Sequence, residues 1–491
     1  MKIAVVGGGT AGFVSALVLK TGLPNFQVDI IRSTKIGTIG VGEGSTEHWS
    51  GFMDYVGISA SDVIKHCDAT FKSGIMFENW SKNPYLQAVH GPLVATHNGM
   101  PMIYAKLFGD NADNRMLNGD YLWDNKTPFM KFVEERPNET GVSQYHFNTH
   151  KLNEFLTNFA LGKGCNVYDD EINEVILENG NVDKLIGNNQ TYDYDFYVDC
   201  TGFKRLLIDK MGAKWNSYSK YLKMKEAIVF PTEYTDTIDP RGSEIPIWTL
   251  ARAMDAGWMF RIPVFDRKGN GYIFDSDFIT AEEAQKEVEE YLGHGVEVAK
   301  HIKFDPGALD TPWVNNVCAI GLSANFVEPL EASSIGTSIN QALLLAQRIV
   351  NYNDATIDRY NIEVNAIMEN IRDFIALHYI TDRRDTPFWK AVAETPIPDS
   401  LDKNLRMWKH RMPVEDDFTS YTKKVLFNEY NYAIVMYGLG HFDTNSIRNQ
   451  YNTLPDGAKE HTERQIQEKL NFDTIKAIPH KTMLELIREI A

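Results

Sequence analysis

The chain begins with the stretch IAVVGGGTAG at residues 3–12. Its four apolar residues suit a short buried strand, and residues 13–20 carry an apolar face at helical spacing. Gly7, Gly9 and Gly12 occupy the positions of a G-x-G-x-x-G turn, which lets the backbone approach a pyrophosphate and a helix pack closely on a strand. Because strand, turn and helix follow in the correct order, the stretch predicts a dinucleotide site in a Rossmann-like α/β fold.

The end of the second apolar strand, residues 28–31, departs from the usual dinucleotide pattern. An acidic residue about 20 positions after the glycines normally binds the adenosine ribose. This chain has Arg32 and Ser33 there, and Asp29 is expected to face the other side of the strand. An arginine is compatible with a ribose phosphate, as in NADP, but the motifs below favour a flavin. We therefore expect Ser33 or the backbone to contact the ribose.

Composition limits the classes of function. The 491 residues suggest two to three domains or one large α/β fold with insertions. A net charge of −17 without a basic run disfavours nucleic acid and anionic membrane as partners. The four cysteines are scattered and form no C-x-x-C pair, so we expect no disulfide framework and no metal site. No stretch reaches about 18 apolar residues, and a soluble, cytoplasmic protein is predicted.

A second informative stretch, residues 320–335, combines two glutamates, a proline and two serines. An apolar strand, a loop and a helix opening at Ser333 and Ser334 are predicted from its pattern. Unpaired N–H groups at a helix start carry partial positive charge and attract small anions. Glu331 lies just before that anion site. A simple N-cap after a turn is the alternative explanation.

Two further segments carry single charged residues in unusual settings. Residues 39–46 form a glycine-rich loop with one acid, Glu43, which in isolation is typical of a surface loop. Lys72 stands among apolar and aromatic residues in the stretch FKSGIMFENW at residues 71–80. Most lysines are solvated, and a side chain that extends along apolar surface to water is the alternative to a functional lysine.

Taken together, these segments resemble the flavin-dependent halogenases of the tryptophan-halogenase type. The resemblance implies an α/β, FAD-binding Rossmann-like fold of the glutathione-reductase and hydroxylase type, with a β-sheet substrate module and a helical C-terminal region. We expect an FAD-binding module over 1–350, with inserted substrate-binding segments at roughly 86–140 and 215–300, and a helical region over 351–491 that completes the substrate pocket. The matching segments are residues 7–13, 40–46, 71–80, 145–148, 199–203, 257–263 and 316–335.

The resemblance also implies the chemistry. FADH2 and O2 would oxidise a halide ion (chloride, bromide or iodide) to hypohalous acid, which would halogenate a small electron-rich aromatic substrate of the indole or phenol type. Lys72 would polarise the oxidant through a hydrogen bond or, as a neutral amine, form a haloamine. Glu331 would hold the oxidant or accept the ring proton, and it is also the natural ion-pair partner of a buried Lys72. Since one dinucleotide motif is present, a separate NADH-dependent flavin reductase is implied, and a homo-oligomer is left open.

The site residues implied by these motifs fall into three further groups. Ser333 and Ser334 would bind the halide. The tunnel wall between flavin and substrate would consist of Trp258, Phe260, Ile262 and Pro263. The cofactor would be bound by Gly7, Gly8, Gly9, Thr10, Ala11, Gly12, Ser33, Gly42, Glu43, Gly44, Leu322 and Ile335.

Three departures from the family pattern bear on function. Phe260 replaces the second tryptophan of the W-x-W-x-I-P signature, which leaves room for some monooxygenation. Residues 332–334 read Ala-Ser-Ser in place of Ser-Thr-Gly, which preserves backbone anion binding. The family's free-tryptophan enzymes close the substrate pocket partly with a C-terminal tryptophan, but the last tryptophan here is Trp408. Tyr430, Tyr432 and Tyr437 are the aromatics available instead, so free tryptophan as the substrate is in doubt.

Two alternatives remain open. A single-component FAD aromatic hydroxylase explains the nucleotide motifs and leaves Lys72 and Glu331 as coincidence. A non-catalytic flavin-binding remnant is favoured only by the departures at Arg32 and Phe260.

Overall fold

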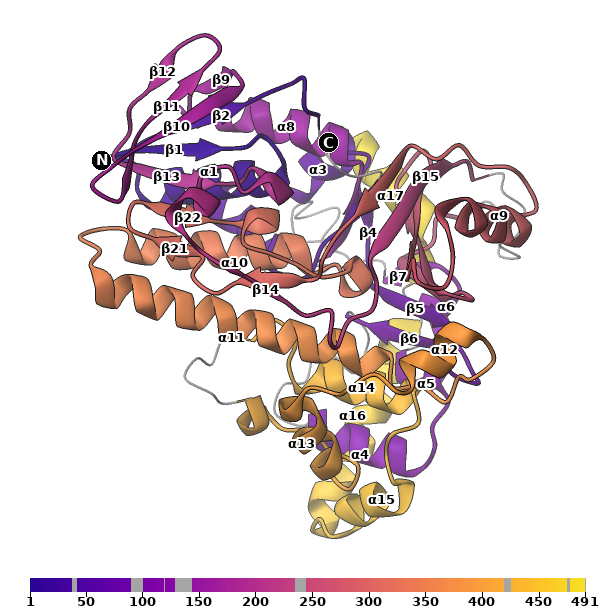
Figure 1. The fold of residues 1–491 in the computed structure, drawn as a ribbon. Coiled ribbons are helices and arrows are strands. Elements are labelled where there is room, and N and C mark those ends of the chain that lie inside the picture. The colour runs from indigo at the N-terminus through magenta and orange to yellow at the C-terminus, as the bar shows by residue number, and fades with distance from the viewer. Residues whose placement is uncertain are drawn as a thin grey trace.

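A computed structural model describes the chain except for residues 38–41, 90–99, 119, 129–143, 235–243, 419–424, 475–476 and 491. Its N-terminal layer is a six-stranded sheet in which all neighbours pair in parallel except the edge pair β21 and β22 (Figure 1). The order across the sheet is β21 (Trp313–Val314), β22 (Val317–Ala319), β13 (Phe196–Asp199), β1 (Lys2–Val6), β2 (Gln27–Arg32) and β9 (Val167–Asp169).

The predicted strand, glycine turn and helix at the N-terminus are confirmed as β1 and α1 (Thr10–Gly22). Helix α1 packs against α8 (Thr149–Gly162) and α10 (Ser333–Arg348). Asp29 in the neighbouring strand β2 is buried and accepts a hydrogen bond from the Tyr194 hydroxyl at 2.7 Å. Asp29 is therefore engaged inside the protein and, as predicted, does not face the expected ribose position.

A seven-stranded sheet forms the second large layer. Residues 257–263 and 267–274 have a pattern typical of a hairpin, and β17 and β18 form it, pairing in register from Gly257 opposite Phe274 to Pro263 opposite Lys268. Strands β16 and β5 pair in parallel, which brings the segment after Lys72 into this sheet. The order is β19 (Lys300–Lys303), β15 (Glu226–Thr232), β18 (Lys268–Phe274), β17 (Gly257–Pro263), β16 (Trp248–Ala253), β5 (Gly74–Glu78) and β6 (Tyr85–Ala88).

A three-stranded sheet and several shorter elements fill the space beside the two layers. The sheet has the order β3 (Glu43–Gly44), β8 (Tyr145–Phe147) and β4 (Thr70–Phe71). It joins the glycine-rich loop to the segment around Lys72. The neighbouring elements are α2 (His48–Val56), α3 (Ala60–His66), α9 (Ala281–Leu292), β14 (Trp215–Ser217), β20 (Gly307–Leu309) and β23 (Asn325–Phe326).

Two further segments contain several short elements. Residues 167–186 have a pattern typical of hairpin strands, yet β9 joins the parallel sheet, and the hairpin consists of β10 (Ile172–Glu178) and β11 (Asn181–Gly187), with β12 (Thr191–Tyr192) beside it. The aromatic segment 90–140 contains helices α4 (Met100–Gly109), α5 (Asn114–Asn118) and α6 (Asp120–Trp123) and a strand, β7 (Lys126–Pro128). Its residues 90–99 and 129–140 lie outside the described chain.

The C-terminal part is mostly helical, as predicted, and α11 runs along the parallel-sheet layer (Figure 1). The last part of the chain returns to the segment around residue 127, because β24 (Ala477–Pro479) pairs with β7. The helices are α11 (Asp354–His378), α12 (Pro387–Val392), α13 (Asp399–Trp408), α14 (Glu429–Gly438), α15 (Thr444–Asn452), α16 (Asp456–Thr474) and α17 (His480–Ile490).

Candidate active site

The glycine turn between β1 and α1 is tightly packed at Gly7 and Gly12 and open at Gly9. Gly7 has φ +127°, and a Cβ atom there would lie 2.1 Å from the Cys200 carbonyl oxygen. A Cβ at Gly12 would lie 2.0 Å from the Gly7 oxygen, whereas nothing lies within 4 Å of a Cβ at Gly9. Helix α1 starts after Gly9 without a side-chain cap. Its first N–H groups therefore face an open space suited to a phosphate.

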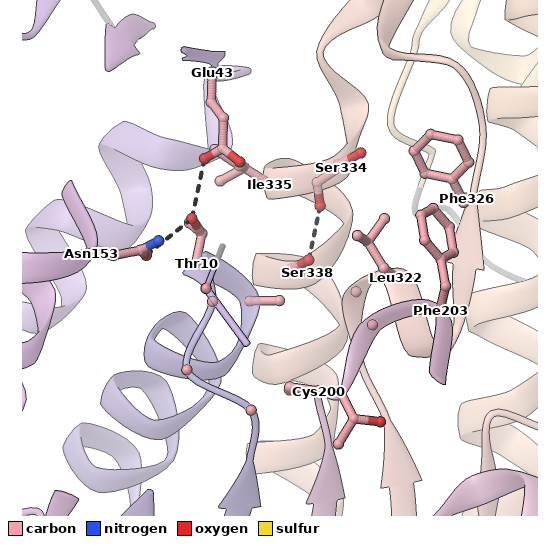
Figure 2. Close-up of a pocket in the computed structure, with 18 of the residues that line it drawn as sticks. Thr10, Glu43, Asn153, Cys200, Phe203, Leu322, Phe326, Ser334, Ile335 and Ser338 are labelled. Carbon is pink, nitrogen blue, oxygen red and sulfur yellow. Dashed lines mark hydrogen bonds between the residues drawn. The ribbon is translucent and has the colours of Figure 1, made fainter. Parts of the chain in front are cut away.

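A cavity of about 1070 Å³ opens at this turn (Figure 2), and residues of both large sheets contribute to its lining. Most of the residues predicted to bind a cofactor contribute to its wall, together with part of the predicted tunnel wall. The predicted residues that line it are Gly7, Gly8, Gly9, Thr10, Ala11, Ser33, Gly42, Glu43, Gly44, Phe260, Ile262, Leu322, Ser334 and Ile335. Segments far apart in the sequence thus form one site of dinucleotide size.

Arg32 and Ser33 also line the cavity, at the end of β2. The Arg32 Nη1 donates to the Thr157 hydroxyl at 3.0 Å. Its Nε is buried, and the described residues offer it no acceptor. A buried donor without a partner is costly, and an oxygen of a bound ligand would satisfy it. The arginine that replaces the usual acid is therefore placed to contact the ligand, beside the predicted Ser33.

Glu43 enters the cavity opposite α10 (Figure 2). The Thr10 hydroxyl donates to Glu43 Oε2 at 3.1 Å and lies 3.3 Å from Asn153 Oδ1. Burial raises the pKa of Glu43 to about 7, and the Thr10 hydrogen bond opposes that rise. A carboxyl group that is half neutral near pH 7 disturbs a neighbouring anionic ligand less than a full negative charge does.

The helix predicted to open at Ser333 and Ser334 is confirmed as α10, which begins at Ser333. Ala332 precedes the helix in the left-handed conformation, with φ 53°, and provides no side-chain cap. Such a conformation is strained for a residue other than glycine and is enriched at functional sites. Ser334 lines the cavity, whereas Ser333 is buried and its carbonyl accepts from Thr337 Oγ1 at 2.9 Å. Ser334 therefore brings the start of this helix to the cavity wall.

Lys72 is buried, with 1% of its surface exposed, which excludes the solvated alternative. Its Nζ donates to the Ser45 carbonyl at 2.9 Å. Burial lowers the pKa of Lys72 to about 8, while the negative charges of Glu331 and Glu47 oppose that shift. Gly44 separates Lys72 from the cavity, since a Cβ there would lie 3.7 Å from Lys72 Cδ and 3.4 Å from Ala332 Cβ. The lysine therefore sits immediately behind the cavity wall.

Glu331 is equally buried, in the short 3-10 turn Pro329–Glu331. Its Oε1 lies 2.7 Å from His378 Nε2. Gln87, with its amide nitrogen facing the carboxylate, donates to Oε1 at 2.6 Å and to Oε2 at 3.2 Å. The predicted ion pair between Lys72 and Glu331 is not formed, because no described carboxylate lies within 4.0 Å of the lysine Nζ. Glu331 is paired with a histidine from α11 instead.

The predicted tunnel wall on β17 lines the cavity only in part. Phe260 and Ile262 line the cavity. Trp258 lies on the same face of the strand, two residues before Phe260, and is buried beyond the cavity with its ring 6.1 Å from that of Phe260. The Pro263 carbonyl accepts from the Thr70 hydroxyl at 2.6 Å, which ties the wall to the strand before Lys72. Of the predicted site residues, Gly12, Lys72, Trp258, Pro263, Glu331 and Ser333 thus stand next to the cavity without lining it.

Sequence reasoning gave no role to three buried polar residues near Glu331. His378 and Gln87 contact it directly, as described above. Glu328 is buried, its pKa is raised by burial to about 8, and its Oε1 accepts from the Tyr379 hydroxyl at 2.6 Å. Only His378 could have been noticed in the sequence, because it lies four positions after Phe374 and therefore on the apolar face of a predicted helix.

The C-terminal aromatics considered as pocket residues are engaged elsewhere. The Tyr430, Tyr432 and Tyr437 hydroxyls donate to the carbonyls of Ala88, Asn370 and Ala112. Within the described chain, no group of three His, Cys, Asp or Glu residues is arranged to hold a metal ion. Nor is any described helix both long and apolar enough to cross a membrane.

Comparison with known proteins places this geometry in context. The family model described as tryptophan halogenase matches residues 2–452. The chain is 31% identical over 474 residues to the 7-chloro-L-tryptophan 6-halogenase KtzR of Kutzneria sp. (strain 744), covering 89% of this chain and 90% of that protein. It is 30% identical to the tryptophan 7-halogenase RebH of Lentzea aerocolonigenes, with 89% of each covered. The crystal structure of a tryptophan halogenase from Shewanella frigidimarina NCIMB 400 superposes with a TM-score of 0.89 at 27% identity, covering 100% of this chain and 98% of that one.

Proposed function

The chain belongs to the tryptophan halogenase family of flavin-dependent enzymes, and we propose that it oxidises halide with FADH2 and O2 to halogenate a small electron-rich aromatic compound. The observation that carries this proposal is the buried amine of Lys72 and the buried carboxyl of Glu331 behind the wall of a dinucleotide-sized cavity. Two buried ionisable groups are costly unless the chemistry uses them.

The cavity residues would hold FAD in a defined orientation. The N–H groups after Gly9 would bind its pyrophosphate, and Arg32 Nε would donate to one of its oxygens. Reduced FAD, when bound, supplies with O2 the two-electron oxidation that converts halide to hypohalous acid. The other cofactor-binding residues proposed from the sequence, including Gly42, Leu322 and Ile335, close the wall around it.

The start of α10 would bind the halide. Helix N–H groups and the helix dipole attract an anion, and the cavity excludes much of the water that would screen it. The side chain of Ala332 cannot compete for those N–H groups, since it has no acceptor. We propose that the backbone of Ser333 and Ser334 provides the donors.

Lys72 would act on the hypohalous acid after it passes the wall formed by Phe260, Ile262 and Gly44. As an ammonium group, Lys72 donates a hydrogen bond that polarises the oxidant, and as a neutral amine it forms a haloamine. A pKa of about 8 makes both forms accessible near neutral pH. Glu331 accepts the ring proton as the carbon–halogen bond forms.

The substrate would be of the indole or phenol type. Relatives named as tryptophan halogenases favour an indole. No tryptophan follows Trp408, and the described C-terminal tyrosines are bound to backbone carbonyls. We therefore expect small phenols and indoles to be accepted side by side, with residues 351–491 completing the pocket. Turnover of free tryptophan alone in a substrate panel, at one ring position, would contradict this breadth.

One experiment separates the proposed function from its alternatives. The protein is supplied with chemically reduced FAD and an aromatic panel, with and without bromide or iodide, and in parallel with NAD(P)H. Halide-dependent product supports the halogenase, and hydroxylated product that depends on NAD(P)H supports a hydroxylase. No product in any arm supports a flavin-binding remnant. Restoring turnover from NADH by adding a separate flavin reductase would support the two-component arrangement.

A further inference from the structure

The strand that leads into Lys72 is held by its own sheet on one side only. Strand β4 pairs with β8, and the Lys72 N–H donates to the Gln144 carbonyl at 3.0 Å. Among the described strands β4 lies at the edge of this sheet, in the order β3, β8, β4. Successive N–H groups of a strand point to opposite edges, so the Phe71 N–H points away from β8. Because Phe71 is buried, that N–H needs an acceptor from elsewhere.

His480 supplies this acceptor from near the far end of the chain. The Phe71 N–H donates to His480 Nε2 at 3.1 Å, across 409 positions of sequence. The two rings are 5.9 Å apart and inclined by 26°, and the histidine has no exposed surface. His480 is the first residue of α17, which packs against α3 in the N-terminal half of the chain (Figure 1). The contact therefore joins the C-terminal helix to the strand before Lys72.

The two hydrogen bonds of the imidazole define its protonation. A backbone N–H only donates, so Nε2 of His480 accepts and carries no proton. Nδ1 lies 3.0 Å from the Ile245 carbonyl oxygen, which only accepts, so Nδ1 carries the proton. Burial lowers the pKa of His480 to about 4, and the ring is therefore neutral at pH 7. The neutral ring bridges the backbone at Phe71 and Ile245.

The segment that carries His480 is itself anchored. Strand β24, directly before it, pairs with β7, and the His480 N–H donates to the Asn125 carbonyl at 2.9 Å. Met483, Leu484 and Ile487 of α17 are buried in the large hydrophobic core. The imidazole thus belongs to a packed element of the fold.

The position of Phe71 bears directly on Lys72, the next residue. The Lys72 side chain is 1% exposed, and its Nζ donates to the Ser45 carbonyl at 2.9 Å. Its amine extends from a Cα whose place depends on the preceding peptide. A buried N–H without an acceptor is costly, so loss of the His480 acceptor would favour a shift of β4 that exposes the Phe71 N–H to water.

We propose that His480 is a positioning residue: by accepting the Phe71 N–H it holds the backbone from which Lys72 extends, and so sets where the lysine amine lies. The consequence for halogenation rests on the proposed function, in which that amine acts on the oxidant. His480 does not line the cavity, and it acts on the chemistry through Phe71.

Three variants test the hydrogen bond. His480→Leu removes the acceptor, whereas His480→Gln offers an amide oxygen to Phe71 and an amide N–H to the Ile245 carbonyl. Ile487→Val, two turns along α17, is the matched control, because it removes one buried methyl group and leaves the acceptor in place.

Two measurements on the FAD-free protein report the geometry. Mass spectrometry follows deuterium exchange of the peptide that spans residues 70–73, and the rate at which the Lys72 amine is reductively methylated. In His480→Leu we expect both rates to rise by about tenfold or more, because the edge N–H has lost its partner. His480→Gln and Ile487→Val should stay within about threefold of the wild type.

The reaction provides a third readout. With reduced FAD, halide and an aromatic substrate, His480→Leu should oxidise the flavin at an unchanged rate and give about tenfold less halogenated product per flavin oxidised. His480→Gln should recover the product yield. A general loss of structure would instead lower flavin oxidation and product together.

The outcomes separate the two proposals. Wild-type protein without halide-dependent product refutes the proposed function, while exchange and methylation still decide whether His480 positions Lys72. Unchanged exchange and methylation in folded His480→Leu overturn the inference, as does an equal acceleration in His480→Gln, because the acceptor would then be irrelevant.

A measurement on the wild type covers the case in which His480→Leu does not fold. NMR of protein labelled with 15N-histidine shows which ring nitrogen carries the proton, and the His480 signal is assigned by its loss in His480→Gln. Protonation at Nδ1 alone at pH 7 supports the inference. A proton on Nε2 overturns it, because that nitrogen could not accept from Phe71.

Discussion

Replacing Lys72 by methionine should abolish halogenation and, at neutral pH, stabilise the protein. Lys72→Met retains the apolar stem and removes the amine, so the group proposed to act on the oxidant is lost. Flavin oxidation should continue, because the lysine stands behind the cavity wall. The gain in stability arises because a charged amine is buried at 1% exposure.

The magnitude follows from the pKa of Lys72, which burial lowers from 10.5 to about 8. A difference of this size corresponds to about 3 kcal/mol at about 1.36 kcal/mol per unit. The folded pKa lies below the unfolded one, so the full cost applies below pH 8 and stability rises with pH between 8 and 10.5. The variant also loses the hydrogen bond to Ser45, worth about 1 kcal/mol. The expected net gain is about 2 kcal/mol at pH 7 and close to zero at about pH 10.

Urea denaturation at pH 7 and at pH 10 measures this difference. Lys286→Met is the matched control, because 76% of that lysine side chain is exposed. The control should change the free energy of unfolding by less than about 0.5 kcal/mol at either pH. If Lys72→Met destabilises the protein at pH 7, or if its effect is the same at both pH values, the burial argument is wrong. If the folded variant still halogenates at an ordinary rate, the proposed role of Lys72 is wrong.

Three other predictions test the cofactor site, the halide site and the mode of Lys72. Gly9→Asp should abolish FAD binding in a fluorescence titration while Gly9→Ala retains it, because the open space there admits a side chain and only the charge opposes phosphate. Ser334→Pro removes a backbone donor in the first helical turn, where proline is tolerated, and should raise the halide concentration needed for half-maximal rate at least tenfold. Ser333→Ala should change it less than threefold, and equal effects would argue against a backbone site. Halogenation should rise with pH through about 8 if Lys72 works as a neutral amine, and fall through the same range if it works as an ammonium donor. Activity retained in Lys72→Arg would independently favour the donor.

The sequence by itself determined the elements whose cause is local. The glycine turn at Gly7, the start of α10 at Ser333 and the hairpin of β17 and β18 each follow from periodicity, backbone freedom or turn chemistry within a few residues. The tight packing of the Gly7 and Gly12 backbones is also visible in the sequence, because no other residue type fits such a turn. The order of the motifs along the chain also resembles one enzyme family, and the predicted chemistry of Lys72 and Glu331 came from that resemblance.

Only the tertiary structure decided how the charges of the site are paired. The sequence predicted Glu331 as the partner of Lys72, whereas the structure pairs it with His378 and Gln87, which come from α11 and β6. The burial of Lys72 likewise depends on Ser45 and on a strand pairing between β5 and β16. Such contacts join elements far apart in the chain, and local patterns carry no information on which buried polar groups meet. Which buried polar groups become partners depends on the complete fold, in which each buried donor and charge needs a partner.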